Sequence, residues 1–364
     1  MKVGIVGLPN IGKSTIFNAL TESDIPANNY PFCTIEPNSG IVQVPDKRLD
    51  IINSFIETEK IVPTLIEFVD IAGLVKGASQ GEGIGNQFLS NIRNVDAIIH
   101  VVRCFEDNNI THVEGSINPL RDIEIIETEL IIKDIETIEK RIQKVQKHVK
   151  AQDKDAIIEL KILQDVLEYL NSNQWVYNFN GNSLEREIIK SWFLLTDKPV
   201  IYVCNIDESQ LINQDHNMLK NVIDFAHKRN FIQMQLCGNL EMEISQIDDK
   251  NEKSDFLESY NLESSGLDLL ILQAYKLLGL ITFFTAGEKE IRAWTIPLNI
   301  LAPQAAGVIH TDFETGFIKA EIYHIDDLER YQSEQAIKEQ GKIRIEGKNY
   351  IMQDGDIVLF RFNV

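Results

Sequence analysis

The stretch "KVGIVGLPNIGKSTIFNALT", residues 2–21, decides the fold class of this chain. It begins with an apolar run typical of a buried strand, and its last residues have the spacing of an amphipathic helix. Between the two, Gly7, Gly12, Lys13 and Ser14 meet the pattern G-x-x-x-x-G-K-S, which surrounds phosphate groups with backbone amides and a helix N-terminus. The segment therefore predicts a strand, a phosphate-binding loop and a helix, in that order.

Four more apolar runs rich in Val and Ile follow, at residues 65–70, 97–102, 199–204 and 231–236. Helical patterns lie between them, and strands that alternate with helices predict a parallel sheet covered on both faces. We therefore expect an α/β fold, a P-loop nucleoside triphosphatase domain with a doubly wound, mostly parallel sheet. Ligands of such sheets bind at the carboxyl ends of the strands.

Composition limits the class of protein. The chain has 364 residues and a net charge of -20, so the whole molecule repels nucleic acid at long range and an RNA contact requires a local basic patch. No apolar run approaches the roughly 18 residues of a membrane span. The four cysteines form no C-x-x-C pair. These features predict a cytoplasmic protein without a membrane partner.

Apolar residues between the strand runs at 97–102 and 199–204 recur at steps of three and four, first from Ile131 to Val149 and then from Ala156 to Leu170. Asn118–Pro119 is a helix-start signal, and "AQDKDA" is a polar break. The segment predicts an antiparallel coiled-coil helical hairpin, although two core helices of a larger bundle would give the same pattern.

The character of the sequence changes again near residue 280, where short β-rich segments begin. Alternating "IRIEG" and "DIVLFRF" around "QDGD" predict hairpins in a small mixed β domain. We therefore expect a P-loop domain over 1–118 and 199–279, a helical insertion over 119–198, and a C-terminal domain over 280–364.

A triphosphate site needs more than one motif. Lys13 is expected to neutralise the β- and γ-phosphates, and Ser14 to ligate Mg²⁺. Asp70 ends the strand "LIEFVD", so it can hold magnesium, and the Gly73 amide can meet the γ-phosphate. Thr34 lies on a loop between these motifs and can complete the magnesium shell when the γ-phosphate is present, as in a nucleotide switch.

The position that often carries a water-orienting glutamine, directly after D-x-x-G, holds Leu74. Leucine cannot position water, so hydrolysis needs a partner or another group. Two histidines follow in sequence. His100 lies within an apolar strand and is predicted to be a core residue, whereas His112 follows a polar loop and is the candidate to orient the water, with a surface or capping role as its alternative.

The expected guanine-reading motif N-K-x-D is replaced by "NIDE" at residues 205–208. Ile206 stands in the lysine position, and Glu208 takes the aspartate position with one more methylene. A site that pairs poorly with guanine loses its discrimination, and Asn205 can pair with an adenine amino group, so ATP is admitted. Asp207 could still read guanine from a shifted loop, which keeps a GTPase as the alternative.

The stretches "NYPFCTIEPN", "DIAGLVKGASQGEGIGNQFLSNIR", "ITFFTAGEKEIRAW" and "EGKNYIMQDGDIVLFRFNV" resemble, in this order, the YchF family of Obg-like ATPases over nearly the whole chain. The resemblance implies a translation-factor-class G domain and a C-terminal β-grasp TGS domain. It also implies preference for ATP over GTP, Leu74 in place of the glutamine, and His112 in hydrolysis. The residues expected at the nucleotide are Asn10, Ile11, Gly12, Lys13, Ser14, Thr15, Gly73, Asn205, Ile206 and Glu208.

The resemblance also implies ribosome association, through the large subunit or the whole ribosome. The best local patch for RNA is "KRIQKVQKHVK" at residues 140–150, although a solvated helix face gives the same pattern. Asn10 resembles the P-loop asparagine of potassium-stimulated relatives, so K⁺ is a candidate cofactor beside Mg²⁺. The main hypothesis is an ATPase whose nucleotide state controls ribosome binding; the alternative from another class is a nucleotide-sensing binding module with incidental turnover.

Overall fold

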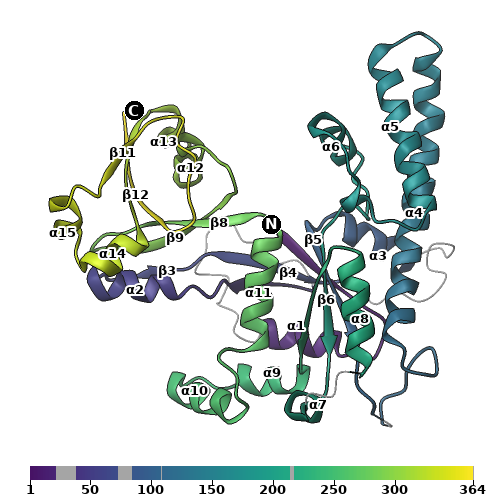
Figure 1. The fold of residues 1–364 in the computed structure, drawn as a ribbon, viewed down its shortest axis with the longest axis horizontal. Helices are drawn as coiled ribbons and strands as arrows, with labels where there is room; N and C mark the ends of the chain where they lie inside the picture. Colours follow the sequence, from purple (N-terminus) through teal and green to yellow (C-terminus); the bar gives the residue numbers. More distant parts are fainter. Residues whose placement is uncertain (22–37, 73–83, 108, 214–216, 364) are drawn as a thin grey trace. The chain divides into compact units, whose positions relative to one another are not determined.

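The structure is a computed structural model that describes residues 1–21, 38–72, 84–107, 109–213 and 217–363. Contacts divide the chain into two compact units, the first formed by residues 1–42 and 67–270 and the second by residues 43–66 and 271–364. Each unit is built around one six-stranded sheet (Figure 1).

The sheet of the first unit has the strand order β2-β4-β1-β5-β6-β7. β1 pairs in parallel with both β4 and β5, and β6 pairs in parallel with both β5 and β7. The carboxyl ends of these five strands therefore meet at one edge, as the sequence predicts. The strands are β1 (Lys2–Val6), β2 (Ser39–Gln43), β4 (Leu65–Asp70), β5 (Ala97–Arg103), β6 (Val200–Asn205) and β7 (Ile232–Leu236).

Helices flank this sheet (Figure 1). Every residue of β5 and β6 is buried, which is why these strands read as continuous apolar runs in the sequence. The fold class is thus confirmed as an α/β P-loop type. The flanking helices are α1 (Lys13–Thr21), α3 (Ile84–Arg93), α7 (Glu208–Asn213), α8 (Asn217–Lys228), α9 (Gly238–Ser245), α10 (Lys250–Ser259) and α11 (Gly266–Leu277).

The helical hairpin is present between β5 and β6. Asn118 caps α4 (Pro119–Val149) by accepting a hydrogen bond from the Arg121 amide at 3.2 Å. Asp153 caps α5 (Lys154–Asn171) by accepting from the amides of Asp155 and Ala156. The predicted polar break, residues 151–156, covers the turn between the two helices and the first residues of α5.

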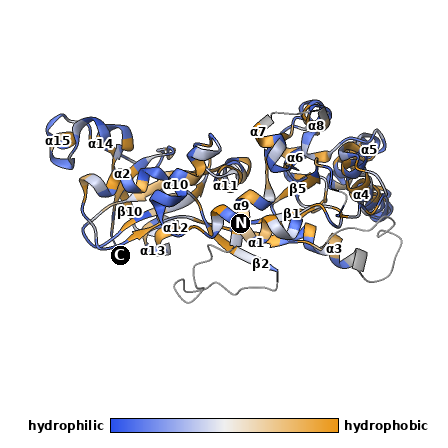
Figure 2. Cartoon of the chain, turned by 90° about the horizontal axis from the view of Figure 1, so that it is seen from below, coloured by the Kyte–Doolittle hydropathy of each residue, from blue (hydrophilic) through white to orange (hydrophobic). Residues whose placement is uncertain are grey.

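The two hairpin helices lie antiparallel and side by side (Figure 1), and both carry hydrophilic and hydrophobic residues (Figure 2). Their apolar stripe also packs against the segment that follows, with the 3-10 helix η2 (Val176–Asn178) and α6 (Ser183–Lys190). The helical insertion therefore contains more than the two helices of the predicted hairpin, because η2 and α6 share its core. The buried cluster comprises Ile131, Ile138, Val145, Ala156, Ile162, Leu163, Val166, Leu170, Val176, Ile189, Trp192 and Leu194.

Two buried carboxylates fix α4 to the rest of the unit. Glu127 accepts a hydrogen bond from the Tyr202 hydroxyl of β6, and its other oxygen lies 3.1 Å from a guanidinium nitrogen of Arg229. Asp134 accepts from the amides of Leu195 and Thr196 at 3.0 and 2.7 Å. Burial raises the pKa of Asp134 to about 6. Both carboxylates lie on the buried side of α4, so their hydrogen bonds anchor the N-terminal half of this helix to the rest of the unit.

The second unit has the sheet order β11-β10-β12-β8-β9-β3. Residues 43–66 join it, because Ile61 of β3 pairs with Ile291 of β9, and Leu49 and Ile52 of α2 share its core. No sequence signal indicates that residues 43–66 belong to the second unit. The predicted domain boundaries remain a prediction. The elements are α2 (Lys47–Phe55), β3 (Ile61–Val62), β8 (Leu280–Thr285), β9 (Ile291–Pro297), α12 (Ala302–Ile309), α13 (Thr311–Thr315), β10 (Phe317–His324), α14 (Ile325–Tyr331), α15 (Glu334–Glu339), β11 (Arg344–Glu346) and β12 (Asp356–Phe362).

The prediction of a hairpin between "IRIEG" and "DIVLFRF" is wrong. Both segments form strands, β11 and β12, but each pairs antiparallel with β10, which lies between them. Glu321 of β10 is the partner of Ile345 on one side and of Leu359 on the other. Periodicity identifies strands, but it does not say which strand occupies the middle of a sheet.

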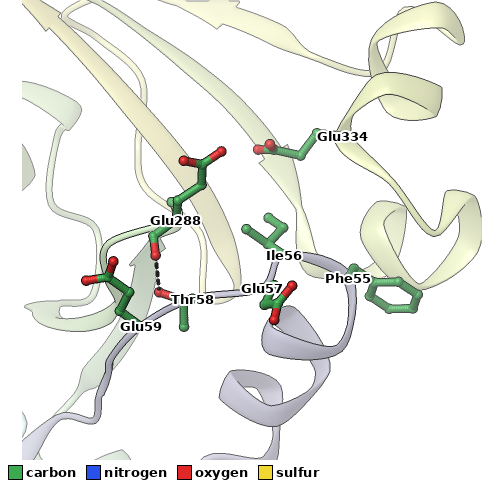
Figure 3. A pocket seen from close by; sticks show the side chains of 8 residues that line it. Phe55, Ile56, Glu57, Thr58, Glu59, Glu288 and Glu334 are labelled. Atoms are coloured by element: carbon green, nitrogen blue, oxygen red, sulfur yellow. Dashed lines mark hydrogen bonds between the residues drawn. The ribbon is translucent and has the colours of Figure 1, made fainter.

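A pocket of about 750 Å³ lies in the second unit (Figure 3). Its lining residues carry four carboxylates and include none of the residues expected at the nucleotide. They are Phe55, Ile56, Glu57, Thr58, Glu59, Gly287, Glu288 and Glu334. Among the described residues, no helix combines the length and the apolar character needed to cross a membrane.

His100 is a core residue, as predicted. It is 3% exposed, stands between Val6 of β1 and Tyr202 of β6, and its ring centroid lies 5.7 Å from that of Tyr202. Burial disfavours the charged imidazolium and lowers the pKa of His100 from 6.5 to about 3. The ring is therefore neutral at physiological pH and serves packing.

This burial predicts a pH dependence of stability. A folded-state pKa below the unfolded value gives a contribution that is complete above about pH 6.5 and is lost as the pH falls towards 3, at roughly 1.4 kcal/mol per pH unit. Replacing His100 by Gln removes this term. In urea unfolding between about pH 7 and 4, we expect a shallower loss of stability in H100Q than in the wild type; parallel curves would contradict the assignment.

Candidate nucleotide site

The loop between β1 and α1 has a backbone that favours its glycines. Gly12 has φ +91°, a left-handed conformation, and a Cβ at this position would lie 2.1 Å from Nδ2 of Asn205. A Cβ on Gly7 would lie 2.8 Å from the carbonyl oxygen of Val101. Both positions exclude a larger residue, so the loop can approach its neighbours closely. Asn10 also has a positive φ, +62°.

Lys13 and Asp70 meet at this loop. Lys13 is the first residue of α1 and is 9% exposed, and Asp70 is the last residue of β4, the parallel neighbour of β1. Nζ of Lys13 and Oδ1 of Asp70 form an ion pair. The parallel pairing of Ile5 with Asp70 places the carboxylate beside the loop, so two residues 57 positions apart share one site.

The residues around this pair suit a magnesium nucleotide. Ser14 is exposed at the N-terminus of α1, next to the carboxylate-bearing end of β4. A hydroxyl and a carboxylate are the oxygen ligands that Mg²⁺ prefers, with waters and phosphate oxygens in its other positions. No group of three or more His, Cys, Asp or Glu residues suited to a metal is found within the described ranges.

The other loop residues have different surroundings. Ile11 is buried and Thr15 is half-buried, so Ile11 contributes only its backbone to the surface of the loop. Thr34, predicted at the magnesium, Gly73, predicted at the γ-phosphate, and Leu74, in the position of the water-orienting glutamine, lie outside the described residues.

Asn205 connects the phosphate loop to the end of β7. Its Nδ2 donates to the carbonyl of Ile11 at 2.8 Å, and its Oδ1 accepts from the amide of Gly238 at 3.0 Å. The side chain is 4% exposed. A carboxamide has two N–H groups and two lone pairs, so one of each remains for a base. Asn205 is thus a structural brace in addition to a candidate base contact.

The rest of "NIDE" shows why the guanine-reading pattern is altered. Ile206 is 2% exposed and belongs to the core. Asp207 and Gln210 form a reciprocal cap for α7, in which the Gln210 amide donates to Asp207 and the Asp207 amide donates to the Gln210 side chain. Glu208 is exposed and accepts a hydrogen bond from the Tyr260 hydroxyl at 2.6 Å. Both carboxylates therefore have protein partners.

His112 lies in the loop after β5 and is 7% exposed. Its Nε2 is 2.8 Å from Oδ2 of Asp122, and its Nδ1 accepts from the amide of Glu114 at 3.1 Å. The preceding residue, Thr111, accepts a hydrogen bond through its carbonyl from Asn10 of the phosphate loop at 3.2 Å. The structure thus links the histidine loop to the phosphate loop, and both ring nitrogens of His112 have protein partners.

Sequence reasoning missed two arginines that hold this loop. Arg103 is fully buried, and its guanidinium donates to the carbonyls of Phe105, Asp107 and Ile110. Arg121 donates to Asp122 and to Ser116. A charged residue at the end of a buried strand, as in "HVVRC", was the available signal for Arg103. The contacts of Arg121 depend on tertiary structure and have no sequence signature.

The brace formed by Asn205 is testable through stability. In Asn205→Asp, one carboxylate oxygen can still accept from Gly238, but the other faces the Ile11 carbonyl and repels it. We expect a loss of about 1–3 kcal/mol in the free energy of unfolding, measured in urea. Glu208→Gln, which changes a neighbouring exposed residue, serves as control and should change it little; an unaltered N205D would contradict the brace.

Comparisons with known proteins identify the family of this chain. A family profile described as "50S ribosome-binding GTPase" matches residues 2–161, and a profile for the C-terminal domain of YchF GTPases, described as a protein of unknown function, matches residues 280–363. The Ribosome-binding ATPase YchF of Pasteurella multocida is 51% identical over 363 residues, covering 100% of this chain and 99% of its own. That of Bacillus subtilis is 49% identical over 365 residues, covering 100% of both.

A solved structure of the YchF GTPase of Schizosaccharomyces pombe is also similar. It is 40% identical, superimposes with a TM-score of 0.89, and the match covers 99% of this chain and 97% of that chain. A GTP-binding protein of Pyrococcus horikoshii shares the fold, with a TM-score of 0.62 at 20% identity. Identity near one half over the full length places the sequence within one family: this chain belongs to the YchF family.

Proposed function

We propose that this protein is a magnesium-dependent ATPase whose bound nucleotide controls its association with the ribosome. The observation that carries the proposal is the Lys13–Asp70 pair at the N-terminus of α1, beside the phosphate loop that Asn205 at the end of β6 contacts through the carbonyl of Ile11. The names of the curated relatives, ribosome-binding ATPases, supply the reaction and the partner.

The chain's own residues bind and neutralise the triphosphate. The amides of the phosphate loop and of the first turn of α1 point at the phosphates, and the helix dipole adds positive potential. Lys13 would exchange part of its contact with Asp70 for the β- and γ-phosphate oxygens, and Ser14 and Asp70 are the residues that would hold the metal. Magnesium, when bound, neutralises charge that develops on the phosphates. Thr34 and Gly73 are assigned to the same site by sequence.

Base selection follows from the altered motif. Guanine recognition needs a free acidic fork, but Asp207 caps α7 and Glu208 is bonded to Tyr260. A guanine would leave its N1–H and amino group poorly paired, which removes most of the discrimination against adenine. The remaining N–H and lone pair of Asn205 can serve an adenine. Hydrolysis of GTP is the second candidate, because a similar solved protein is described as a GTPase.

Competition between ATP and GTP for the site measures the nucleotide preference directly. One fluorescent, magnesium-bound nucleotide is displaced by unlabelled ATP or GTP, and we expect ATP to compete better. The double variant Ile206→Lys/Glu208→Asp restores N-K-x-D, so its preference should move towards GTP by about tenfold or more. A wild-type preference of tenfold or more for GTP would favour the second candidate, and displacement that does not need magnesium would contradict the metal assignment.

His112 is proposed to orient the attacking water, because Leu74 offers no polar group for this task. In the structure, its ring is fixed one residue away from the carbonyl that Asn10 contacts. We expect His112→Ala to lower ATP turnover by about 100-fold or more, with the nucleotide dissociation constant little changed. His148→Ala, which alters an exposed histidine of α4, is the control. Equal turnover in H112A and the wild type would remove His112 from the mechanism.

The ribosome is the proposed partner, and the cytoplasm the proposed compartment, because the curated relatives are named for ribosome binding. The patch predicted at residues 140–150 supports an RNA contact. Lys140, Lys144 and Lys147 are exposed on the C-terminal part of α4, and Lys150, also exposed, is its C-cap, whereas Arg141 is paired with Glu159. Potassium at Asn10 stays a prediction, and Asn10 donates to Thr111 in the structure.

A further inference from the structure

His112 and Asp122 form a buried pair. The Asp122 side chain is 3% exposed, as is the side chain of His112, and their Nε2 and Oδ2 atoms are 2.8 Å apart. The second carboxylate oxygen of Asp122 accepts from Nε and Nη2 of Arg121 at 3.2 and 2.9 Å. Asp122 is therefore bonded on both oxygens, and only one of the two is directed at the histidine.

These contacts determine the tautomer of His112. Its Nδ1 faces the amide hydrogen of Glu114 and must be an acceptor, so the proton of a neutral ring is on Nε2 and is donated to Asp122. The Asp122 carboxylate accepts this hydrogen at Nε2, and it has no hydrogen of its own to donate to Nδ1. Asp122 thus leaves Nδ1 as the nitrogen with a lone pair.

We propose that Asp122 is a positioning residue for hydrolysis, which fixes His112 in the orientation and tautomer that offer Nδ1 to the attacking water. The inference rests on the role proposed for His112 and adds the group through which that role is set. The same relationship, a buried carboxylate that orients a histidine, recurs in hydrolytic sites on unrelated folds.

Only the weaker contact has to change for Nδ1 to become available. The Glu114 amide bonds it at 3.1 Å, and Glu114 is half-buried in a turn that includes Gly115 at φ +77°. The ion-assisted bond to Asp122 is shorter and wholly buried, so it is the one that persists. A water can replace the Glu114 amide by donating one O–H to Nδ1.

Hydrolysis of the γ-phosphate of ATP then proceeds as a displacement by the oriented water. The oxygen of the oriented water forms a bond to the γ-phosphorus, and the bond from that phosphorus to the bridging oxygen breaks, its electron pair leaving on the diphosphate. The protons of the water leave on the inorganic phosphate and to solvent. His112 needs only to direct the lone pair of the water, and Asp122 touches neither water nor nucleotide.

The position of Asp122 is fixed by the anchoring of α4. It lies in the first turn of α4, which Asn118 caps, and Glu127 and Asp134 anchor the same helix to β6 and to residues 195–196. On the other side, Asn10 contacts Thr111 beside His112. The histidine is therefore held between the base of the helical hairpin and the phosphate loop, so its position depends on α4.

Asp122→Asn tests the inference, because the asparagine amide has only one acceptor oxygen where the carboxylate has two. If its oxygen stays with the Arg121 donors, its NH₂ donates to Nε2 and moves the ring proton to Nδ1, where it faces the Glu114 amide hydrogen. We expect single-turnover hydrolysis of ATP to fall by roughly 10- to 100-fold, while the dissociation constant for ATP changes less than about twofold. Asp122→Glu keeps a carboxylate and should retain more turnover than Asn.

A double variant separates positioning from general damage. In the His112→Ala background, Asp122→Asn should have no further effect on turnover, because its target is missing. Asp134→Asn is the matched control, a second buried carboxylate on α4 that does not touch His112. It should lower stability and leave the turnover of folded protein near the wild-type value.

The outcomes are distinguishable. Unchanged turnover in His112→Ala would refute the role proposed for His112 itself. A loss in H112A with wild-type turnover in D122N and D122E would overturn only the positioning role of Asp122. Increased turnover in D122N would show that the pair restrains His112, and it would overturn the inference as well. Should D122N fail to fold, D122E decides, with its turnover compared in the wild-type and in the His112→Ala background.

Discussion

The parallel pairing of β1 with both β4 and β5 is the constraint on which the site depends. It brings the phosphate loop, Asp70 and the histidine loop to one edge of the sheet, although they are far apart in sequence. The next pairings, of β5 with β6 and of β6 with β7, add Asn205 and Gly238 to the same edge. Five strand ends thus contribute to one locus, and none of them has a site alone.

Buried polar groups turn this edge into a defined site. Asn205 satisfies a carbonyl and an amide of two different loops, Arg103 satisfies three carbonyls of a third, and Lys13 faces Asp70. Each group would be costly to bury unpaired, so the loops can adopt few other arrangements. The geometry of the candidate nucleotide site is therefore set by hydrogen bonds whose loss would be costly.

The helical hairpin is connected to this site by carboxylates. Asp122, Glu127 and Asp134 lie along α4 and reach His112, Tyr202 and residues 195–196 in turn. The outer part of the same helix carries the exposed lysines proposed to contact RNA. The contact with His112 and the exposed lysines are therefore carried by one and the same helix.

The sequence by itself determined the phosphate loop, the five parallel strands, the hairpin and the core position of His100, because glycine spacing, apolar runs and caps are local signals. It placed Lys13, Ser14 and Asp70 at one site through the order of the strands. It did not determine the role of residues 43–66, the central position of β10, or the partners of Asn205, Glu208 and His112. Tertiary structure alone decided these, because a buried polar side chain takes whichever partner the packing brings within reach, and that partner is often distant in sequence.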